Sequence, residues 1–138
     1  MRDSNLGAFI NILTDFGFKF IFGNGADPIY LISLLNAVFD GEPRIEKIIK
    51  IDKEQPGENI QDRTIIYDVH CLTDKGETII VEMQNRFQEY YRDRAIYYIS
   101  KDIISQGEKG QEWKFSLKPV YGVFLMNFDW KEFKHDLI

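Results

Sequence analysis

Cysteine and histidine are scarce in this chain, and each shortage excludes a class of site. The 138 residues include a single cysteine, Cys71, so no disulfide can form within the chain. Cys71 lies in an apolar stretch and is expected to be a small core residue, which suits a reducing compartment and predicts a cytoplasmic location. The two histidines, His70 and His135, are far apart and no Cys-x-x-Cys pair is present, so a zinc site is not expected.

Long apolar runs are also missing. No stretch approaches the roughly 18 apolar residues of a membrane span, and the N-terminal sequence MRDSNLGAF lacks the apolar core of a signal peptide. A net charge of −5 opposes strong non-specific attraction to nucleic acid, although it leaves room for a small electropositive groove. Aromatic residues are plentiful, with 11 Phe and 7 Tyr, which together with the length predicts one folded domain over residues 1–138.

The most informative stretch is Thr64–Asn85, which is typical of two strands joined by a tight turn. Each strand carries a carboxylate where an apolar residue is expected, because Asp68 interrupts the run IIYDV and Glu82 interrupts the run IIVEM. Aspartate is depleted in strands, and carboxylates are rarely buried without a partner. Two such exceptions in one hairpin indicate a site.

The residue count across the turn decides whether the two carboxylates meet. If the loop is Asp74–Gly76, residues whose numbers sum to 150 are opposed, and Asp68 and Glu82 satisfy that sum. Gly76 would then occupy the left-handed position of a bulged hairpin. The carboxylates would be neighbours on one face, roughly 5 Å apart at Cβ, with Gln84 beside them because strand side chains alternate. A loop one residue shorter would put the two carboxylates on opposite faces.

Two carboxylates at that spacing suit a hard divalent cation. Mg²⁺ takes one or two protein carboxylates and completes its octahedron with water and substrate oxygens. The simpler interpretation is a surface hairpin whose solvated face happens to carry acidic and amide side chains. Three apolar residues on the same predicted face favour a partly buried cleft instead; they are Ile66, Leu72 and Ile80.

Two helices are predicted before the hairpin. The first spans Asp15–Phe22, with Thr14 as its N-cap. Asp15 and Lys19 are one helical turn apart in it, and this spacing alone indicates an ordinary helical ion pair. The second helix spans Pro28–Phe39, and its predicted core face consists of Leu31, Leu34, Leu35 and Val38.

The remaining elements predict an α/β protein with a mixed sheet. They are a first strand over Ile45–Ile51, a loop over Glu54–Gln61, a long helix over Phe87–Ile104 and a buried central strand within Lys118–Phe128. The long helix allows a parallel crossover between the hairpin and the last strand. It also carries Arg94, which could bind a phosphate through two N–H groups or be a solvated or acid-paired helix residue.

Four segments resemble one nuclease family in their order and spacing. They are TDFGFKFIFG (14–23), LLNAVF (34–39), VEMQ (81–84) and YYRDRAIYY (90–98). With Asp68 in one strand and Glu82 in the next, the chain is similar to the PD-(D/E)XK nuclease superfamily, and more narrowly to Rpn-type recombination-promoting nucleases or transposases. The resemblance spans roughly residues 12–130 and implies a restriction-endonuclease-like αβββαβ core with a mixed central sheet flanked by helices. Residues 131–138 would be a tail that begins a missing C-terminal region.

The resemblance implies a DNA endonuclease that depends on a divalent metal and acts in transposition or recombination. Carried over by position, Asp68 and Glu82 would be the metal-binding acids, and the Met83 backbone carbonyl would add a ligand. Mg²⁺ is the implied metal, with Mn²⁺ as a substitute. Asp15 would match an additional acid of the first helix. Gln84 stands where the superfamily motif has lysine; it can orient an attacking water but cannot stabilise developing charge as a cation does.

The missing lysine leads to the hypothesis that Lys19 or Arg94 supplies the catalytic cation. The alternative is a catalytically weak or inactive nuclease fold that binds nucleic acid or assembles with proteins, which the acidic net charge favours. A third interpretation assigns exposed aromatics to a homodimer interface, which double-strand cutting would need. DNA is the expected partner, and neither a membrane nor a small-molecule cofactor is expected.

Overall fold

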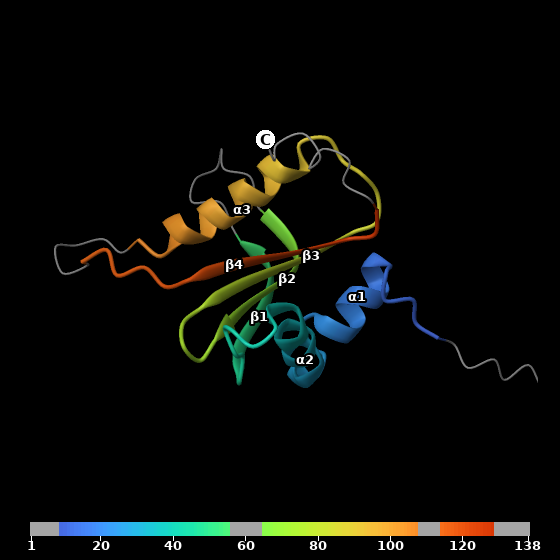
Figure 1. Cartoon of the computed structure of the whole chain (residues 1–138), viewed down its shortest axis with the longest axis horizontal. Helices are drawn as coiled ribbons and strands as arrows, with labels where there is room; N and C mark the ends of the chain where they lie inside the picture. The colour runs from blue at the N-terminus through green and yellow to red at the C-terminus, as the bar shows by residue number, and fades with distance from the viewer. Residues whose placement is uncertain (1–8, 56–64, 108–113, 129–138) are drawn as a thin grey trace, which may run out of the picture.

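The computed structural model describes residues 9–55, 65–107 and 114–128 (Figure 1). In chain order its elements are α1 (Asp15–Phe22), α2 (Pro28–Phe39), β1 (Ile48–Gln55), β2 (Ile65–Thr73), β3 (Thr78–Gln84), α3 (Tyr91–Ser105) and β4 (Val120–Met126). The predicted α/β class and the αβββαβ order are confirmed, with a second helix, as predicted, between the first helix and β1. None of the helices in these ranges is long and apolar enough to cross a membrane.

The sheet has the order β1-β2-β3-β4 and mixes both strand directions. β1, β2 and β3 are antiparallel neighbours, whereas β4 runs parallel to β3. Helix α3 forms the crossover that a parallel pair requires. Figure 1 shows α1 and α2 on one side of the sheet and α3 on the other. The sheet therefore has a helical layer on each face, and side chains from both layers can approach the ends of its strands.

Each face of the sheet has its own apolar cluster. The α1/α2 cluster joins the helical residues Phe18, Leu31 and Leu35 to Val69, Cys71, Ile79, Val81 and Val123 of the strands. The α3 cluster centres on Tyr67 and Ile80, against which Tyr98 and Ile99 pack. Cys71 is buried as predicted. Of the predicted core face of α2, Leu31 and Leu35 are fully buried and Leu34 is partly buried, but Val38 is 44% exposed. The prediction for Val38 is wrong because its position lies at the edge of the apolar stripe.

The turn between β2 and β3 has the predicted three-residue loop. The Thr73 N–H donates to the Glu77 carbonyl at 2.9 Å, and Gly76 has a φ of 80°. Beyond the turn, Val69 pairs with Val81, which is the register that the residue count predicted. The shorter loop, which would have separated the carboxylates, is thereby excluded.

The pairing of β2 with β1 contains an irregularity next to the predicted site. His70 of β2 pairs with Asp52 of β1. Four positions earlier in β2, Ile66 pairs with Glu54, only two positions further along β1. Three residues of β2, with Asp68 in the middle, therefore lie opposite one residue of β1. Bulges of this kind are frequent next to active sites, where they redirect a side chain.

This bulge breaks the alternation of faces that the sequence analysis assumed. Val69 packs in the α1/α2 cluster, whereas Tyr67, two residues earlier, packs in the α3 cluster. Period-two alternation is thus lost across Asp68, and the inference of a common face from alternation alone does not hold there. The physical reason is that the extra residues change the direction of the β2 backbone at this point.

Two predicted boundaries are shifted. The first strand begins at Ile48 and extends to Gln55, so the start of the predicted loop is strand; the remainder of that loop lies outside the described residues. The long helix begins at Tyr91 rather than Phe87, because Tyr90 adopts a left-handed conformation with a φ of 61°. Residues 85–90 therefore form an exposed connector between β3 and α3.

The last strand is shorter and more exposed than predicted. β4 covers Val120–Met126 and lies at the edge of the sheet in the described part of the chain. Only Val123 is buried, and Met126 is 38% exposed. An apolar run of this length predicts a central strand, but an edge strand covered by one helix on each face shows the same composition. The predicted tail, residues 131–138, lies outside the described residues.

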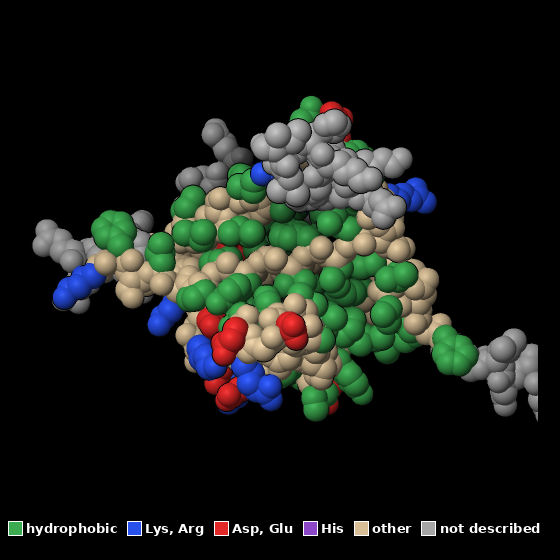
Figure 2. All heavy atoms as spheres, viewed as in Figure 1, with side chains coloured by type: hydrophobic (Ala, Val, Ile, Leu, Met, Phe, Trp, Pro, Cys, Tyr) green, Lys and Arg blue, Asp and Glu red, His purple; other side chains and the backbone are tan. Residues whose placement is uncertain are grey.

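Large apolar side chains remain on the surface. Figure 2 shows that they cover much of one face, whereas acidic and basic side chains gather at one corner of that face. On α1, Phe16 and Phe20 stack with ring centroids 5.7 Å apart while remaining 70% and 59% exposed. The homodimer suggested by exposed aromatics stays a prediction.

Candidate active site

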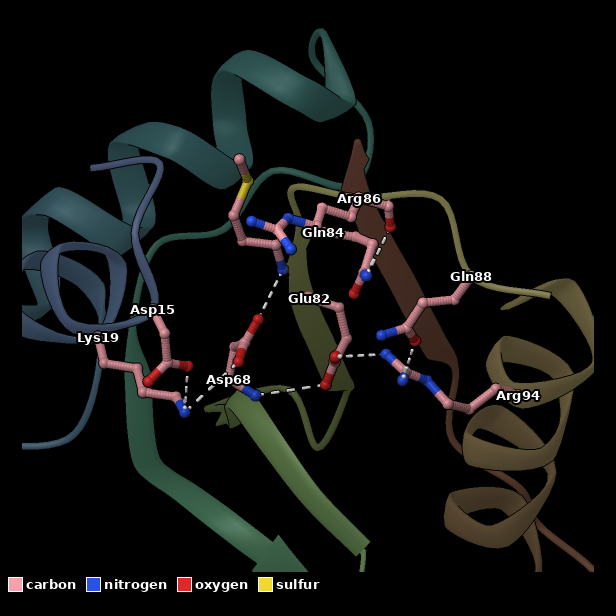
Figure 3. A network of polar contacts seen from close by, with 9 residues as sticks. Asp15, Lys19, Asp68, Glu82, Gln84, Arg86, Gln88 and Arg94 are labelled. Carbon is pink, nitrogen blue, oxygen red and sulfur yellow. Dashed lines mark hydrogen bonds and ion pairs between the residues drawn. The ribbon is translucent and has the colours of Figure 1, made fainter. Parts of the chain in front are cut away.

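Asp68 and Glu82 meet directly beyond the last residue pair of the β2–β3 ladder (Figure 3). Asp68 Oδ2 accepts a hydrogen bond from the Met83 backbone N–H at 2.7 Å. Glu82 Oε1 accepts one from the Asp68 backbone N–H at 3.3 Å. Each carboxylate is therefore bonded to the backbone of the opposite strand. The two acids are neighbours, as predicted, and their positions are set by the main chain.

Glu82 is the more buried of the two acids, with 5% of the residue exposed. Burial, together with the nearby charge of Asp68, raises the pKa of Glu82 to about 7, although the Asp68 N–H, Arg94 and Lys19 lower it by smaller amounts. Two carboxylates confined in a dehydrated space disfavour each other's charge. A cation placed between them would relieve that repulsion.

Lys19 brings a positive charge from α1 to the Asp68 side of the site. Its Nζ lies 2.7 Å from Asp15 Oδ1 and 3.5 Å from Asp68 Oδ1. Burial lowers the pKa of Lys19, but the two acids more than offset that effect and raise it above its usual value. The predicted ion pair within α1 is present, and it extends to the strand acid, which helical spacing alone did not indicate.

Arg94 brings a second positive charge from α3 to the Glu82 side. Its Nη2 lies 3.5 Å from Glu82 Oε2, and its Nη1 donates to Gln88 Oε1 at 2.8 Å. The guanidinium carbon is 5.1 Å from the Tyr91 ring centroid and 5.6 Å from that of Tyr98. These contacts restrict the guanidinium to one orientation. Arg94 is thus an acid-paired residue at the site, and each helical layer contributes one cation.

Gln84 lies at the end of β3, next to Glu82 (Figure 3). Its Nε2 donates to the Arg86 carbonyl at 2.7 Å. Its backbone carbonyl accepts the Asn127 N–H at 2.9 Å, which ties this strand end to the residue that follows β4. Because the amide nitrogen is used, the amide oxygen of Gln84 is left as a hydrogen-bond acceptor.

Oxygen atoms dominate the donors that a metal would meet here. Asp68 and Glu82 offer carboxylates, and Met83 offers a backbone carbonyl. Among the described residues, no group of three or more His, Cys, Asp and Glu side chains is arranged to hold a metal. Mg²⁺ needs only one or two carboxylates and keeps several waters, whereas a structural zinc site needs four protein ligands. The residues present therefore fit Mg²⁺ or Mn²⁺ better than zinc.

A buried polar cluster beneath the site was missed by the sequence analysis. Asp102 of α3 is 4% exposed; its Oδ1 lies 3.0 Å from His70 Nε2, and its Oδ2 accepts from the Tyr67 hydroxyl at 3.4 Å. Tyr98 meets Tyr67 edge to face at a centroid distance of 5.3 Å. Arg94, Tyr98 and Asp102 are spaced at i, i+4 and i+8. This spacing places them on one face of the helix, and it could have indicated from the sequence that Asp102 faces the same side as Arg94.

Comparison with known proteins identifies the family to which the chain belongs. Residues 12–138 match the family model of PD-(D/E)XK nuclease family transposases. Searches among curated proteins and among solved structures give no match. The matched range extends beyond the predicted limit at residue 130 and includes all the site residues described above. The chain therefore belongs to the PD-(D/E)XK nuclease family transposases.

Proposed function

We propose that this protein is a divalent-metal-dependent endonuclease that hydrolyses DNA phosphodiester bonds during transposition or recombination. The observation that carries the proposal is the pair Asp68 and Glu82, which meet directly beyond the paired residues of β2 and β3, with one cation from each helical layer. Membership of a nuclease family supports this chemistry. An acidic pair would repel the DNA backbone, so a metal and the flanking cations are needed for binding.

Each residue of the site has a distinct proposed role. Asp68 and Glu82, with the Met83 carbonyl, would hold Mg²⁺, which supplies Lewis-acid activation of the phosphate when bound. The Gln84 amide oxygen accepts a hydrogen bond from the attacking water and orients it. This oxygen is well suited to that role, because the bond from Nε2 to the Arg86 carbonyl fixes the amide plane. Orientation of this kind reduces the entropic cost of reaching the transition state.

Lys19 and Arg94 would replace the lysine that the superfamily motif has at position 84. The phosphate gains negative charge as the water attacks, and fixed cations lower the energy of that state. Both side chains are already held beside the acids, Lys19 by Asp15 and Arg94 by two aromatic rings. Asp15 acts through Lys19 and is therefore a positioning residue.

Replacing either cation should slow the chemical step. We expect Lys19→Ala and Arg94→Ala each to lower kcat by about 10²-fold, the typical cost of removing one transition-state donor. Lys50→Ala is the matched control for Lys19, because Lys50 is also ion-paired, at 2.7 Å to Asp52, but lies on β1. Single-turnover cleavage of a labelled duplex measures the effect. Cleavage at the wild-type rate by both Lys19→Ala and Arg94→Ala would contradict this role.

The experiment that tests the function itself is cleavage of supercoiled plasmid by the purified wild-type protein. We expect nicked and then linear DNA with Mg²⁺ or Mn²⁺, and intact plasmid when EDTA is added. The competing function is a binding or assembly module without turnover, which the uncharged Gln84 and the net charge of −5 favour. Titration calorimetry separates the two. Absence of both cleavage and Mn²⁺ binding would support the module and overturn the nuclease.

A further inference from the structure

The site has a third cation, Arg86, whose surroundings differ from those of Lys19 and Arg94. Arg86 is exposed and follows Gln84 by two residues. Its backbone carbonyl is held by the Gln84 amide at 2.7 Å, so the base of the side chain is fixed at the mouth of the site. Among the described residues no carboxylate pairs with its guanidinium, and Figure 3 shows no contact from that group to the network.

The other two cations are engaged with the acids. Lys19 bridges Asp15 and Asp68. Arg94 contacts Glu82 and Gln88 and is restricted by aromatic rings. A side chain that is paired with an acid of the site can act at the reacting phosphate, but it has little freedom to contact other phosphates of the substrate strand. Within the ranges that the structure describes, no partner occupies the five guanidinium N–H donors of Arg86, whose planar fork matches the oxygens of a phosphate.

The surroundings of Arg86 leave room for a nucleic-acid strand. Residues 85–90 are all exposed and connect the end of β3 to the start of α3. The connector starts directly after Gln84, which lies next to Glu82 (Figure 3), so a strand lying along it would approach the two acids. Because the chain as a whole carries a charge of −5, such a strand needs a local positive contact that no neighbouring carboxylate neutralises.

We propose that Arg86 binds a phosphate of the substrate strand adjacent to the scissile one, as a substrate-binding residue rather than the catalytic cation. This inference rests on the proposed nuclease function. The three cations then have different roles, since Lys19 and Arg94 act on the chemical step whereas Arg86 contributes affinity. A contact made equally in the ground state and the transition state changes KM and leaves kcat unaltered.

The test compares Arg86→Gln with Arg44→Gln, which removes the same charge at the other end of the hairpin. Arg44 is exposed, and its carbonyl accepts from Lys75 in the β2–β3 turn at 3.3 Å. We expect Arg86→Gln to raise KM about 10-fold and to keep kcat within about twofold of the wild-type value. The slope of log(kcat/KM) against log[KCl] should become smaller in magnitude by about 1, because one phosphate contact is lost. Arg86→Lys should keep the salt slope, because it keeps the charge, while losing part of the affinity with the fork. Arg44→Gln should match the wild type.

A second measurement identifies the phosphate. Single methylphosphonate groups, which are uncharged, are placed one at a time along a duplex substrate. At the contacted position, we expect the substitution to weaken binding to the wild type but to have no further effect with Arg86→Gln, as a double-mutant cycle requires for a direct contact.

Three outcomes would overturn the assignment of Arg86. They are equal salt slopes for Arg86→Gln and Arg44→Gln, a loss confined to kcat, or additive effects of Arg86→Gln with every methylphosphonate. Failure of the proposed function looks different, since the wild type itself would then not cleave the duplex with either Mg²⁺ or Mn²⁺. If the wild type binds DNA without cleaving it, the salt slope of the binding constant still decides the role of Arg86.

Discussion

Asp68→Asn and Glu82→Gln should each reduce Mg²⁺-dependent DNA cleavage by about three orders of magnitude. A bound metal contributes several kcal/mol of charge stabilisation to the transition state, and about 1.4 kcal/mol corresponds to a tenfold change in rate. Both substitutions keep the size of the side chain and an oxygen that can accept the backbone N–H bonds. They remove the negative charge that a divalent cation needs. The loss should therefore come from chemistry and metal binding rather than from unfolding.

Cleavage rate and thermal unfolding of the same preparations measure these effects separately. Glu77→Gln is a suitable control, because Glu77 also accepts a hydrogen bond, from the Thr73 hydroxyl at 3.1 Å, but lies beside the turn. It should cleave DNA at the wild-type rate. Calorimetry should show that Asp68→Asn and Glu82→Gln bind Mn²⁺ weakly. Equal nicking by the wild type and both site variants would indicate a contaminating nuclease and would refute the assignment of the two acids.

Metal binding and cleavage should both increase steeply as the pH rises through about 7. Burial next to Asp68 raises the pKa of Glu82 to about 7 from its ordinary value of 4.5, so in the metal-free protein much of this acid is protonated below neutrality. A ligand carboxylate must lose its proton before it binds a cation. Below the pKa, the apparent affinity for Mg²⁺ should therefore change about tenfold for each pH unit.

The stability of the metal-free protein should show the opposite dependence. The folded state binds the Glu82 proton more tightly than the unfolded state, so this residue favours folding most at low pH. That contribution is lost as the pH rises from about 4.5 through about 7, where the buried carboxyl ionises in the fold. Mg²⁺ should restore the melting temperature at high pH and have little effect at low pH.

Melting temperatures and Mg²⁺ affinities measured between about pH 5.5 and about pH 8.5 test both parts. Glu82→Gln provides the control, because it has no proton to lose at this position. Its melting temperature should lack the part of the pH dependence that the wild type owes to Glu82. If the wild-type affinity for Mg²⁺ were constant over this range, the shifted ionisation of Glu82 would not govern the site.

The parts of the fold that the sequence predicted are those decided by neighbouring residues. Thr14 and Asp27 cap the two N-terminal helices through their own side chains, which fixes where α1 and α2 start. The hairpin register follows from the loop ending at Gly76, where a positive φ is required. Asp68 and Glu82 could be placed next to each other because that register relates residues only 14 positions apart.

The features that escaped prediction depend on contacts between distant segments. The bulge around Asp68 arises from pairing with β1, whose sequence carries no sign of it. The start of α3 is set by the left-handed Tyr90, although the apolar spacing before it resembles helix. Asp102 is a plain helical acid in the sequence, and only the packing of α3 against β2 gives it His70 and Tyr67 as partners. Which cation meets which acid likewise follows from the layering of the helices.

The crossed hydrogen bonds of Asp68 and Glu82 also bear on when the protein can become active. Each acid is anchored to an amide of the opposite strand, so its position depends on the alignment of the two strands. A hairpin shifted by one residue would turn one acid away and leave the other facing the wrong amide. If the protein is the nuclease proposed above, hydrolytic competence would then arise only at the end of folding, and incompletely folded chains would leave DNA intact.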